Sequence, residues 1–253
     1  FISNSAESFS QIVLVLAVAN ILVAVMIWIT LEDDHSHTHS TYNVSSVADE
    51  IRLIIQLPQV WFLSFIVFCS YSAYWGTYYF APYATEVFSI SVVAGGTIGV
   101  VRMWLKPASA FFAGLIADQL GPTRTVLIFL VLTATGFSLL SVVPKNTDVL
   151  LFAMALIFVM SIAVSALRGI YFSMLEESNI PEISTGIAVG LISMIGFSPD
   201  VFMPILGGYL LDKFPEGLGY QYYFGAIAMI CWVGVFMGVY VLRGRKSSEI
   251  QRS

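Results

Sequence analysis

Four charged residues of this sequence stand inside long apolar runs, where a charge is costly and therefore informative. Arg102 and Lys106 lie one helical turn apart in one run, and Arg168 and Asp200 stand in two later runs. On insertion scales an Arg or Asp at the centre of a bilayer costs ~2.5–3.5 kcal/mol, so such side chains face a polar cavity or a partner. We therefore expect these four residues to contribute to a polar site within the apolar spans.

Three interpretations of this charged set remain open. Arg102 and Asp200, which stand at similar depth in their runs, can form a buried ion pair that only fixes helix packing. Together with Lys106 they can form a gate or a proton-sensitive element that changes partners as the protein works. The basic residues can also form an inward-facing site for an anion.

Two helix faces carry further candidates for a cavity or binding role. Side chains spaced by three or four residues share one face of a helix. The two sets are Ser161, Ser165 and Arg168 on one face, and Tyr71, Tyr74 and Tyr78, with Trp75 adjacent, on the other. Aromatic hydroxyls at this spacing can bind a polar ligand, but aromatic-rich spans also serve as packing surfaces or interface belts. For the tyrosines both interpretations remain open.

The runs that hold these residues predict an all-α integral membrane protein. Of its 253 residues 58% are hydrophobic and 11% are charged, whereas soluble domains carry about 25% charged residues. A helix needs ~20 apolar residues to cross the hydrocarbon core. Seven spans are predicted, at residues 10–31, 59–83, 90–117, 125–143, 149–175, 184–211 and 222–242. Pro107, Pro199 and Pro204 predict kinks or breaks within them.

The longest polar segment separates the first two predicted spans. It contains His35, His37 and His39, and it ends in an amphipathic stretch at residues 47–57 that predicts a helix lying along the bilayer surface. Alternating histidines can chelate a metal ion. In an acidic and polar linker, however, a solvated cluster without a metal is the favoured interpretation.

The distribution of lysine and arginine predicts the orientation, because cytoplasmic segments are enriched in both. With the C-terminus inside, six basic residues fall in cytoplasmic segments and two fall outside. The six are Arg52, Arg124, Arg243, Arg245, Lys246 and Arg252, and the two are Lys145 and Lys213. This count predicts a cytoplasmic C-terminus and a cytoplasmic polar segment.

Several classes of chemistry lack their sequence signatures. The sequence contains no G-x-x-x-x-G-K-[ST] phosphate-binding loop, no H-E-x-x-H and no G-x-S-x-G, so neither an ATP-driven pump nor an enzyme is predicted. Cys69 and Cys231 both stand in apolar runs, which indicates packing residues and not a disulfide or metal framework. We expect no cofactor, no metal ion and no nucleic-acid partner.

The connection between the third and fourth predicted spans carries the most informative motif. Residues 114–124 read G-L-I-A-D-Q-L-G-P-T-R, which resembles the G-x-L-A-D-x-x-G-R-K signature of the major facilitator superfamily. Gly114, Asp118 and Gly121 match, and Arg124 follows a Pro-Thr pair that replaces the usual basic residues. Glycine permits close helix approach, and an Asp at a helix end can accept hydrogen bonds from the N-terminus of a neighbouring helix.

The resemblance implies how the spans are organised. In this superfamily the signature follows the second helix of each six-helix half, so the span before it corresponds to helix eight of twelve. Residues 1–31 then correspond to helix six, residues 32–58 to a cytoplasmic central linker, residues 59–242 to a six-helix C-terminal half, and residues 243–253 to a cytoplasmic tail. We accordingly expect a fragment whose partner is the missing N-terminal half of the same polypeptide.

The resemblance also implies a function. A protein of this kind is a permease, a secondary active transporter that moves a small solute by alternating access, here in a bacterial inner membrane. We expect coupling to H⁺ or Na⁺, with a symporter favoured over an antiporter. The basic residues within the spans favour an anionic or polyhydroxylated solute. The alternative is a seven-helix receptor or sensor, although residues 222–242 contain no lysine that could form a retinal Schiff base.

Overall fold

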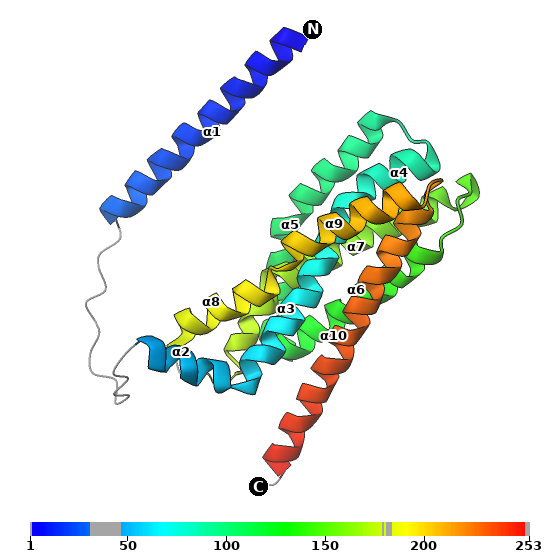
Figure 1. Cartoon of the computed structure of the whole chain (residues 1–253). Coiled ribbons are helices and arrows are strands. Elements are labelled where there is room, and N and C mark those ends of the chain that lie inside the picture. Colours follow the sequence, from blue (N-terminus) through cyan, green and yellow to red (C-terminus); the bar gives the residue numbers. More distant parts are fainter. Residues whose placement is uncertain (1, 31–46, 179, 181–183, 251–253) are drawn as a thin grey trace. The chain divides into compact units, whose positions relative to one another are not determined.

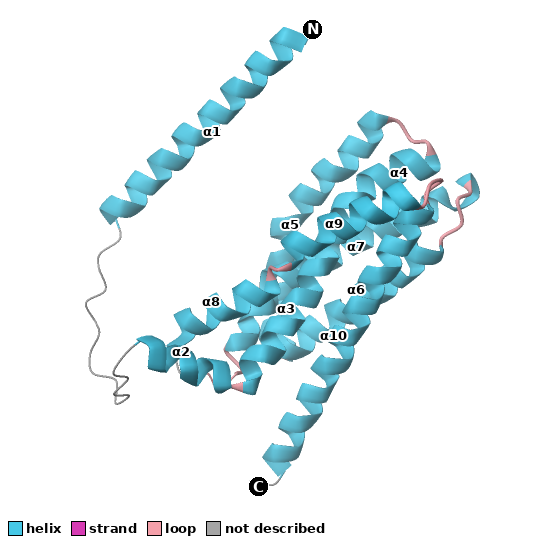
Figure 2. Ribbon diagram, in the orientation of Figure 1, coloured by secondary structure: helices cyan, strands magenta, loops and turns pink. Residues whose placement is uncertain are grey.

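The computed structural model describes residues 2–30, 47–178, 180 and 184–250. Every regular element in these ranges is helical (Figure 1, Figure 2), which confirms the all-α prediction. The chain divides into two compact units, Phe1–Asn43 and Val44–Ser253. The predicted histidine cluster, His35, His37 and His39, lies outside the described residues.

The first unit consists of α1, Ile2–Thr30. Its residues Ser10–Thr30 form a helix that is long and apolar enough to cross a membrane. No charged residue interrupts this stretch, and a helix satisfies all of its own backbone hydrogen bonds in lipid. The first predicted span is therefore present as one uninterrupted helix.

The second unit contains the remaining helices and the 3-10 turns that join them. In chain order they are α2 (Val47–Gln56), α3 (Pro58–Gly76), η1 (Thr77–Tyr79), α4 (Phe80–Phe88), α5 (Val92–Leu120), α6 (Pro122–Val142), η2 (Thr147–Val149), α7 (Leu150–Ile170), η3 (Tyr171–Leu175), α8 (Thr185–Gly196), α9 (Pro199–Lys213) and α10 (Leu218–Ile250). Within the described ranges, six helical segments of the chain can each cross a membrane alone. The count is up to seven if α2 and Pro58–Phe88, bent by 73°, are taken together.

The second and sixth predicted spans differ from simple helices. The second runs from Pro58 to Phe88 through the 3-10 turn η1, and therefore ends later than predicted. The sixth consists of α8 and α9, which are separated at residues 197–198 directly before Pro199. Proline has no backbone N–H to continue the hydrogen-bond ladder, so the break at Pro199 follows the prediction.

α2 is the helix predicted at the end of the polar segment, and it packs against α3 and α8. Its Ile54 is fully buried, and its Glu50 carboxylate accepts a hydrogen bond of 2.7 Å from the Ser184 hydroxyl at the start of α8. Ile51 and Ile55, beside Ile54, are exposed. This apolar edge is compatible with the predicted position at a bilayer surface, which stays a prediction.

α3 lies at the centre of the second unit, in contact with α7, α8, α9 and α10, while α10 also packs along α6 (Figure 1). A Cβ atom at Gly76 of α3 would lie 2.5 Å from Phe137 of α6 and 2.7 Å from Ile227 of α10. Glycine at this position therefore permits three helices to meet closely. Cys69 of α3 and Cys231 of α10 are buried and free, in agreement with their predicted packing role.

The turn between α5 and α6 holds the family-like motif. Gly121 has φ +88, and its N–H donates a 2.8 Å hydrogen bond to the Ala117 carbonyl. The Thr123 hydroxyl donates to the Glu177 carboxylate, which also lies 2.8 Å from where a Cβ of residue 121 would stand. Glu177, after η3, therefore ties the α7–α8 connection to this turn.

The structure distinguishes the two motif glycines. A Cβ at Gly114 would meet nothing within 4 Å, so no other described segment approaches closely there. The crowded glycine is Gly121, where backbone conformation and the Glu177 carboxylate both exclude a side chain. Asp118 and Arg124 are exposed, and their roles stay predictions.

The two motif glycines make a matched pair for a stability test. Gly121→Ala places a Cβ in a backbone region that non-glycine residues populate at a cost of about 1–3 kcal/mol. We therefore expect a clearly lower thermal unfolding midpoint in detergent. Gly114→Ala fills open space in a helix, where alanine is favoured over glycine, and should leave the midpoint unchanged or raise it. Equal losses in both variants would contradict this account of the turn.

Candidate functional site

One side of α3, continued by the 3-10 turn η1, carries a row of aromatic residues, which we call the α3 aromatic face: Tyr71, Tyr74 and Trp75 of α3 and Tyr78 of η1. The rings of Tyr71 and Tyr74 stack with centroids 5.6 Å apart, and the Tyr74 and Tyr78 rings meet edge to face at 5.3 Å. The Tyr74 and Tyr78 hydroxyls share a 2.9 Å hydrogen bond. The helical spacing that defined these residues in the sequence thus produces one continuous surface.

Arg102 of α5 reaches this face. Its side chain is 6% exposed, and its guanidinium carbon lies 4.3 Å from the centre of the Tyr78 ring. One guanidinium nitrogen donates a hydrogen bond to the Thr77 hydroxyl. A guanidinium over an aromatic face is attracted by about 0.5–2 kcal/mol, the larger figure applying where water is excluded.

Two further cations converge on Tyr74, which is itself 7% exposed. Lys106, one turn after Arg102, donates a 3.0 Å hydrogen bond to the Tyr74 hydroxyl. The guanidinium carbon of Arg168, from α7, lies 4.1 Å from the Tyr74 ring centre and 5.6 Å from that of Tyr71. Tyr74 therefore contacts basic residues from two different helices.

Asp200 is the acidic residue that contacts the α3 aromatic face, within the part of the chain that the structure describes. It stands in the first turn of α9, directly after the break between α8 and α9. Its carboxylate accepts a 2.8 Å hydrogen bond from the indole N–H of Trp75 and also interacts with the Tyr71 hydroxyl. A carboxylate at the start of a helix is stabilised by the helix dipole.

The structure does not form the ion pair between Arg102 and Asp200 that one interpretation of the sequence required. Arg102 contacts Thr77 and Tyr78, whereas Asp200 is held by Trp75. The two side chains thus use neighbouring parts of the α3 aromatic face instead of each other. Both side chains end on one segment, Asp200 on α3 and Arg102 on η1, which a comparison of depth along the sequence could not reveal.

The charges at this site do not balance. Arg102, Lys106 and Arg168 face the aromatic residues and are held by hydroxyls and rings, while Asp200 supplies the single carboxylate among the contacts just described. Cations at membrane depth are costly without a counter-charge, and rings compensate only part of that cost. The arrangement is chemically suited to an anionic group.

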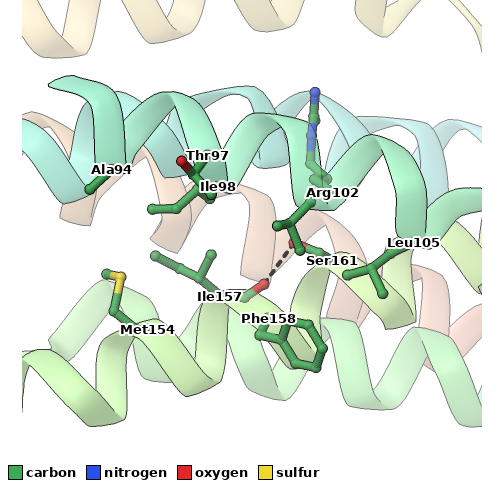
Figure 3. Close-up of a pocket in the computed structure, with 10 residues that line it drawn as sticks. Ala94, Thr97, Ile98, Arg102, Leu105, Met154, Ile157, Phe158 and Ser161 are labelled. Atoms are coloured by element: carbon green, nitrogen blue, oxygen red, sulfur yellow. Dashed lines mark hydrogen bonds between the residues drawn. The ribbon is translucent and has the colours of Figure 1, made fainter.

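The two predicted serines do not reach the α3 aromatic face through any contact among the described residues. Ser161 is buried and donates a 2.8 Å hydrogen bond to the Ile157 carbonyl of its own helix, and Ser165 is buried further along α7. Ser161 lines a crevice of about 160 Å³ between α5 and α7, together with Ile98 and Phe158. In Figure 3 the Arg102 guanidinium points away from this mainly apolar crevice.

Sequence reasoning missed Thr77 and gave Trp75 no role. Both are neighbours of predicted residues in the aromatic span, and each holds one of the charged groups. A threonine directly before Tyr78 was the available signal for Thr77. In the sequence, however, this threonine looks like the many serines and threonines whose hydroxyls bond only to a carbonyl of their own helix.

Comparison with known proteins indicates the family in which this site occurs. The sequence profile described as the Major Facilitator Superfamily matches residues 63–253. The match includes the motif at residues 114–124 and the four charged residues of this site, Arg102, Lys106, Arg168 and Asp200. No solved structure shows a significant match to the chain.

Three relatives show the extent of the similarity. Inner membrane protein YihN of Escherichia coli is 26% identical over 193 residues, which is 75% of this chain and 46% of YihN. Inner membrane protein YqcE of Escherichia coli is 25% identical over 227 residues, 87% of this chain and 53% of YqcE. An uncharacterized protein of Mycoplasma pneumoniae is 27% identical over 149 residues, 58% of this chain and 66% of that protein. The chain spans about half the length of the two E. coli relatives.

The Thr77 contact can be tested with a matched pair of threonines. Thr77→Val leaves the buried Arg102 guanidinium without its hydroxyl acceptor, and an unsatisfied buried group of this kind costs about 1–3 kcal/mol. We expect a lower thermal unfolding midpoint in detergent. Thr97→Val removes a hydroxyl that donates to the Val93 carbonyl on the exposed surface of α5 and should change the midpoint little. Equal effects would show that the Arg102 contact does not contribute.

Proposed function

The chain belongs to the major facilitator superfamily, and on this premise we propose that it forms the solute-binding part of a secondary transporter for a small anionic solute. The observation that carries the proposal is the convergence of Arg102, Lys106 and Arg168 on the α3 aromatic face. Three cations supported by rings and hydroxyls can each turn toward an incoming carboxylate, sulfonate or phosphate. Such charge-assisted hydrogen bonds are among the strongest available to a protein.

The aromatic residues suit a reversible site. A cation that rests on a tyrosine ring is held less tightly than one in a buried ion pair, so a solute anion can replace the ring as its partner without leaving a carboxylate uncompensated. Tyr74 and Tyr78 also present hydroxyls beside the cations, and these can bind polar groups of the solute. The site therefore favours an anion that carries hydroxyl or other polar groups.

Asp200 is the proposed coupling residue. Its carboxylate belongs to the same site as the cations but is held by the Trp75 indole and not by a cation. A proton or Na⁺ bound there would offset the charge of a solute anion bound at Arg102 and Arg168. Symport of H⁺ or Na⁺ with the anion follows from this arrangement as the proposed mode of transport.

The helix break supports alternating access. Transporters bind substrates near discontinuous helices, whose two halves can move separately. Asp200 stands immediately after the break between α8 and α9, and Pro107 lies within the continuous helix α5, one residue after Lys106. Both charged groups of the proposed cycle therefore lie next to positions where their helices can bend.

The proposed protein lies in the inner membrane of a bacterium, with the C-terminus and α2 on the cytoplasmic side. Two relatives are named inner membrane proteins, and the six-to-two distribution of basic residues supports the orientation. The proposed partner is an N-terminal half of the same polypeptide, whose helices would close the solute cavity opposite the α3 aromatic face.

Uptake measurements test the anion site. In cells that express the full coding sequence, we expect uptake or competition by anionic probes such as succinate or inorganic phosphate, and none by uncharged mannitol. Arg102→Gln and Arg168→Gln should each weaken apparent affinity for the responding anion about tenfold or more, because a hydrogen bond between charged groups is lost. The control is Arg52→Gln, an exposed residue of α2, which should leave uptake unchanged.

The result that contradicts the anion site is equally specific. Uptake restricted to uncharged or cationic solutes, or wild-type affinity in both arginine variants at normal membrane abundance, would show that these residues serve only in packing.

The coupling role of Asp200 has a separate readout. If Asp200 carries a proton, wild-type uptake should rise on external acidification, and Asp200→Asn should abolish that rise while leaving solute counterflow in place. Asp148→Asn, at an exposed position in η2, is the control. Retained pH or Na⁺ dependence in Asp200→Asn would assign coupling to another residue.

A further inference from the structure

A second hollow lies on a different side of the molecule, between α6 and α10. It is a groove of about 480 Å³, lined by Ser138, Ser141, Gln221, Tyr222, Gly225 and Met229, among others. Ligand sites typically occupy about 300–1,000 Å³. None of the residues of the α3 aromatic face or its charged partners lines this groove.

The groove opens onto an apolar surface. Met229, Val233, Phe236 and Tyr240 follow one another at helical spacing along α10 and are exposed by 67%, 49%, 70% and 72%. Exposed apolar residues on a membrane-spanning helix face lipid or another apolar surface. The lower part of the groove, at Met229, is therefore continuous with a surface suited to acyl chains.

The other end of the groove is polar. Gln221 donates a 2.8 Å hydrogen bond from its side-chain amide to the Val143 carbonyl at the end of α6, and Tyr222 stands beside it in the first turns of α10. The Ser141 hydroxyl also lies at this end, and it donates a 2.7 Å hydrogen bond to the Ser138 carbonyl. Hydroxyl, amide and phenol groups thus gather where α6 ends and α10 begins, which is the depth at which lipid ester and headgroup atoms lie.

Two lysines flank this polar end. The Lys145 side chain lies against the α9–α10 turn at Gly217, with its Cε 3.4 Å from where a Cβ of Gly217 would stand. Lys213 lies over the Phe214 ring at 5.6 Å, and Phe214 packs edge to face on Tyr222 of the groove at 4.7 Å. Lys145 and Lys213 are the only two basic residues that the sequence assigns to this end of the spans.

From these observations we infer that the α6–α10 groove binds a membrane phospholipid. Its phosphate is held by Lys145 and Lys213, its ester region lies against Gln221 and Tyr222, and one acyl chain extends along Gly225 toward Met229. Basic residues at a membrane surface attract lipid phosphate by charge. The exposed Glu216 on the same turn favours a headgroup that also carries an ammonium, so the lipid is a zwitterionic aminophospholipid.

Native mass spectrometry of the full chain, purified and delipidated in detergent, tests the site with phosphatidylethanolamine as probe. We expect one tightly retained lipid per chain. Gly225→Leu places a side chain in the groove and displaces part of the acyl chain. If two methylene groups of the acyl chain lose their contact with the protein, the affinity for the lipid falls about tenfold. The matched control is Gly208→Leu on α9, where a Cβ meets nothing within 4 Å and lipid retention should be unchanged.

The phosphate contact has its own variants. Lys145→Gln and Lys213→Gln should each weaken retention about fivefold, as expected for one basic residue at a membrane surface, whereas Arg124→Gln at the opposite end of the unit should not. Phosphatidylglycerol should bind no more tightly than phosphatidylethanolamine, and diacylglycerol, which lacks the phosphate, should bind more weakly than either.

Two results would overturn the proposal. Retention that is unchanged by Gly225→Leu would remove the groove as the binding site. Equal retention of diacylglycerol, or indifference to both lysine variants, would show only nonspecific association of acyl chains. Thermal unfolding midpoints of all variants separate loss of lipid from loss of folding.

Discussion

The stacking of basic side chains on Tyr74 is the interaction on which the proposed site depends. Arg168 lies over its ring and Lys106 donates to its hydroxyl, so one nearly buried residue holds two positive charges at the edge of an apolar bundle, the Arg168 side chain being exposed and that of Lys106 half-buried. An arginine or lysine there would otherwise need a carboxylate. Because a ring attracts a cation without neutralising it, the site retains positive charge that a solute can use.

The surrounding fold serves to bring these groups to α3 from separate helices. Gly76 permits α6 and α10 to pack closely on α3, which leaves its aromatic face for α5, α7 and α9. The break before Pro199 begins α9 at the level of Trp75, so that Asp200 reaches the indole N–H. Close packing on one side of α3 and polar contacts on the other are thus two consequences of one central helix.

The proposed solute site and the proposed lipid groove lie on two different sides of this bundle. Residues of α5, α7 and α9 supply the charges, whereas the lining of the α6–α10 groove contains no charged residue; its polar atoms lie at the Gln221 end and at Ser138, which accepts a hydrogen bond from the Trp232 indole. The proposed charged site must be shielded from lipid, whereas the proposed lipid groove must be open to it. Because the two lie on different helices, no charge of the site has to face hydrocarbon at the groove.

Local patterns in the sequence determined the membrane class, the family and most of the residues of the proposed site. Apolar runs predicted the spans because hydrocarbon requires about twenty apolar residues in a row, and charges within those runs identified Arg102, Lys106, Arg168 and Asp200. The spacing of Tyr71, Tyr74 and Tyr78 predicted neighbouring side chains, and their rings do meet, across the junction of α3 with η1. Only the tertiary structure decided the partners: Arg102 with Thr77, Asp200 with Trp75, and the open space at Gly114. Which side chains meet depends on how the helices rotate and cross. These angles are set by packing between residues far apart in the chain, and the periodicity along a single helix does not encode them.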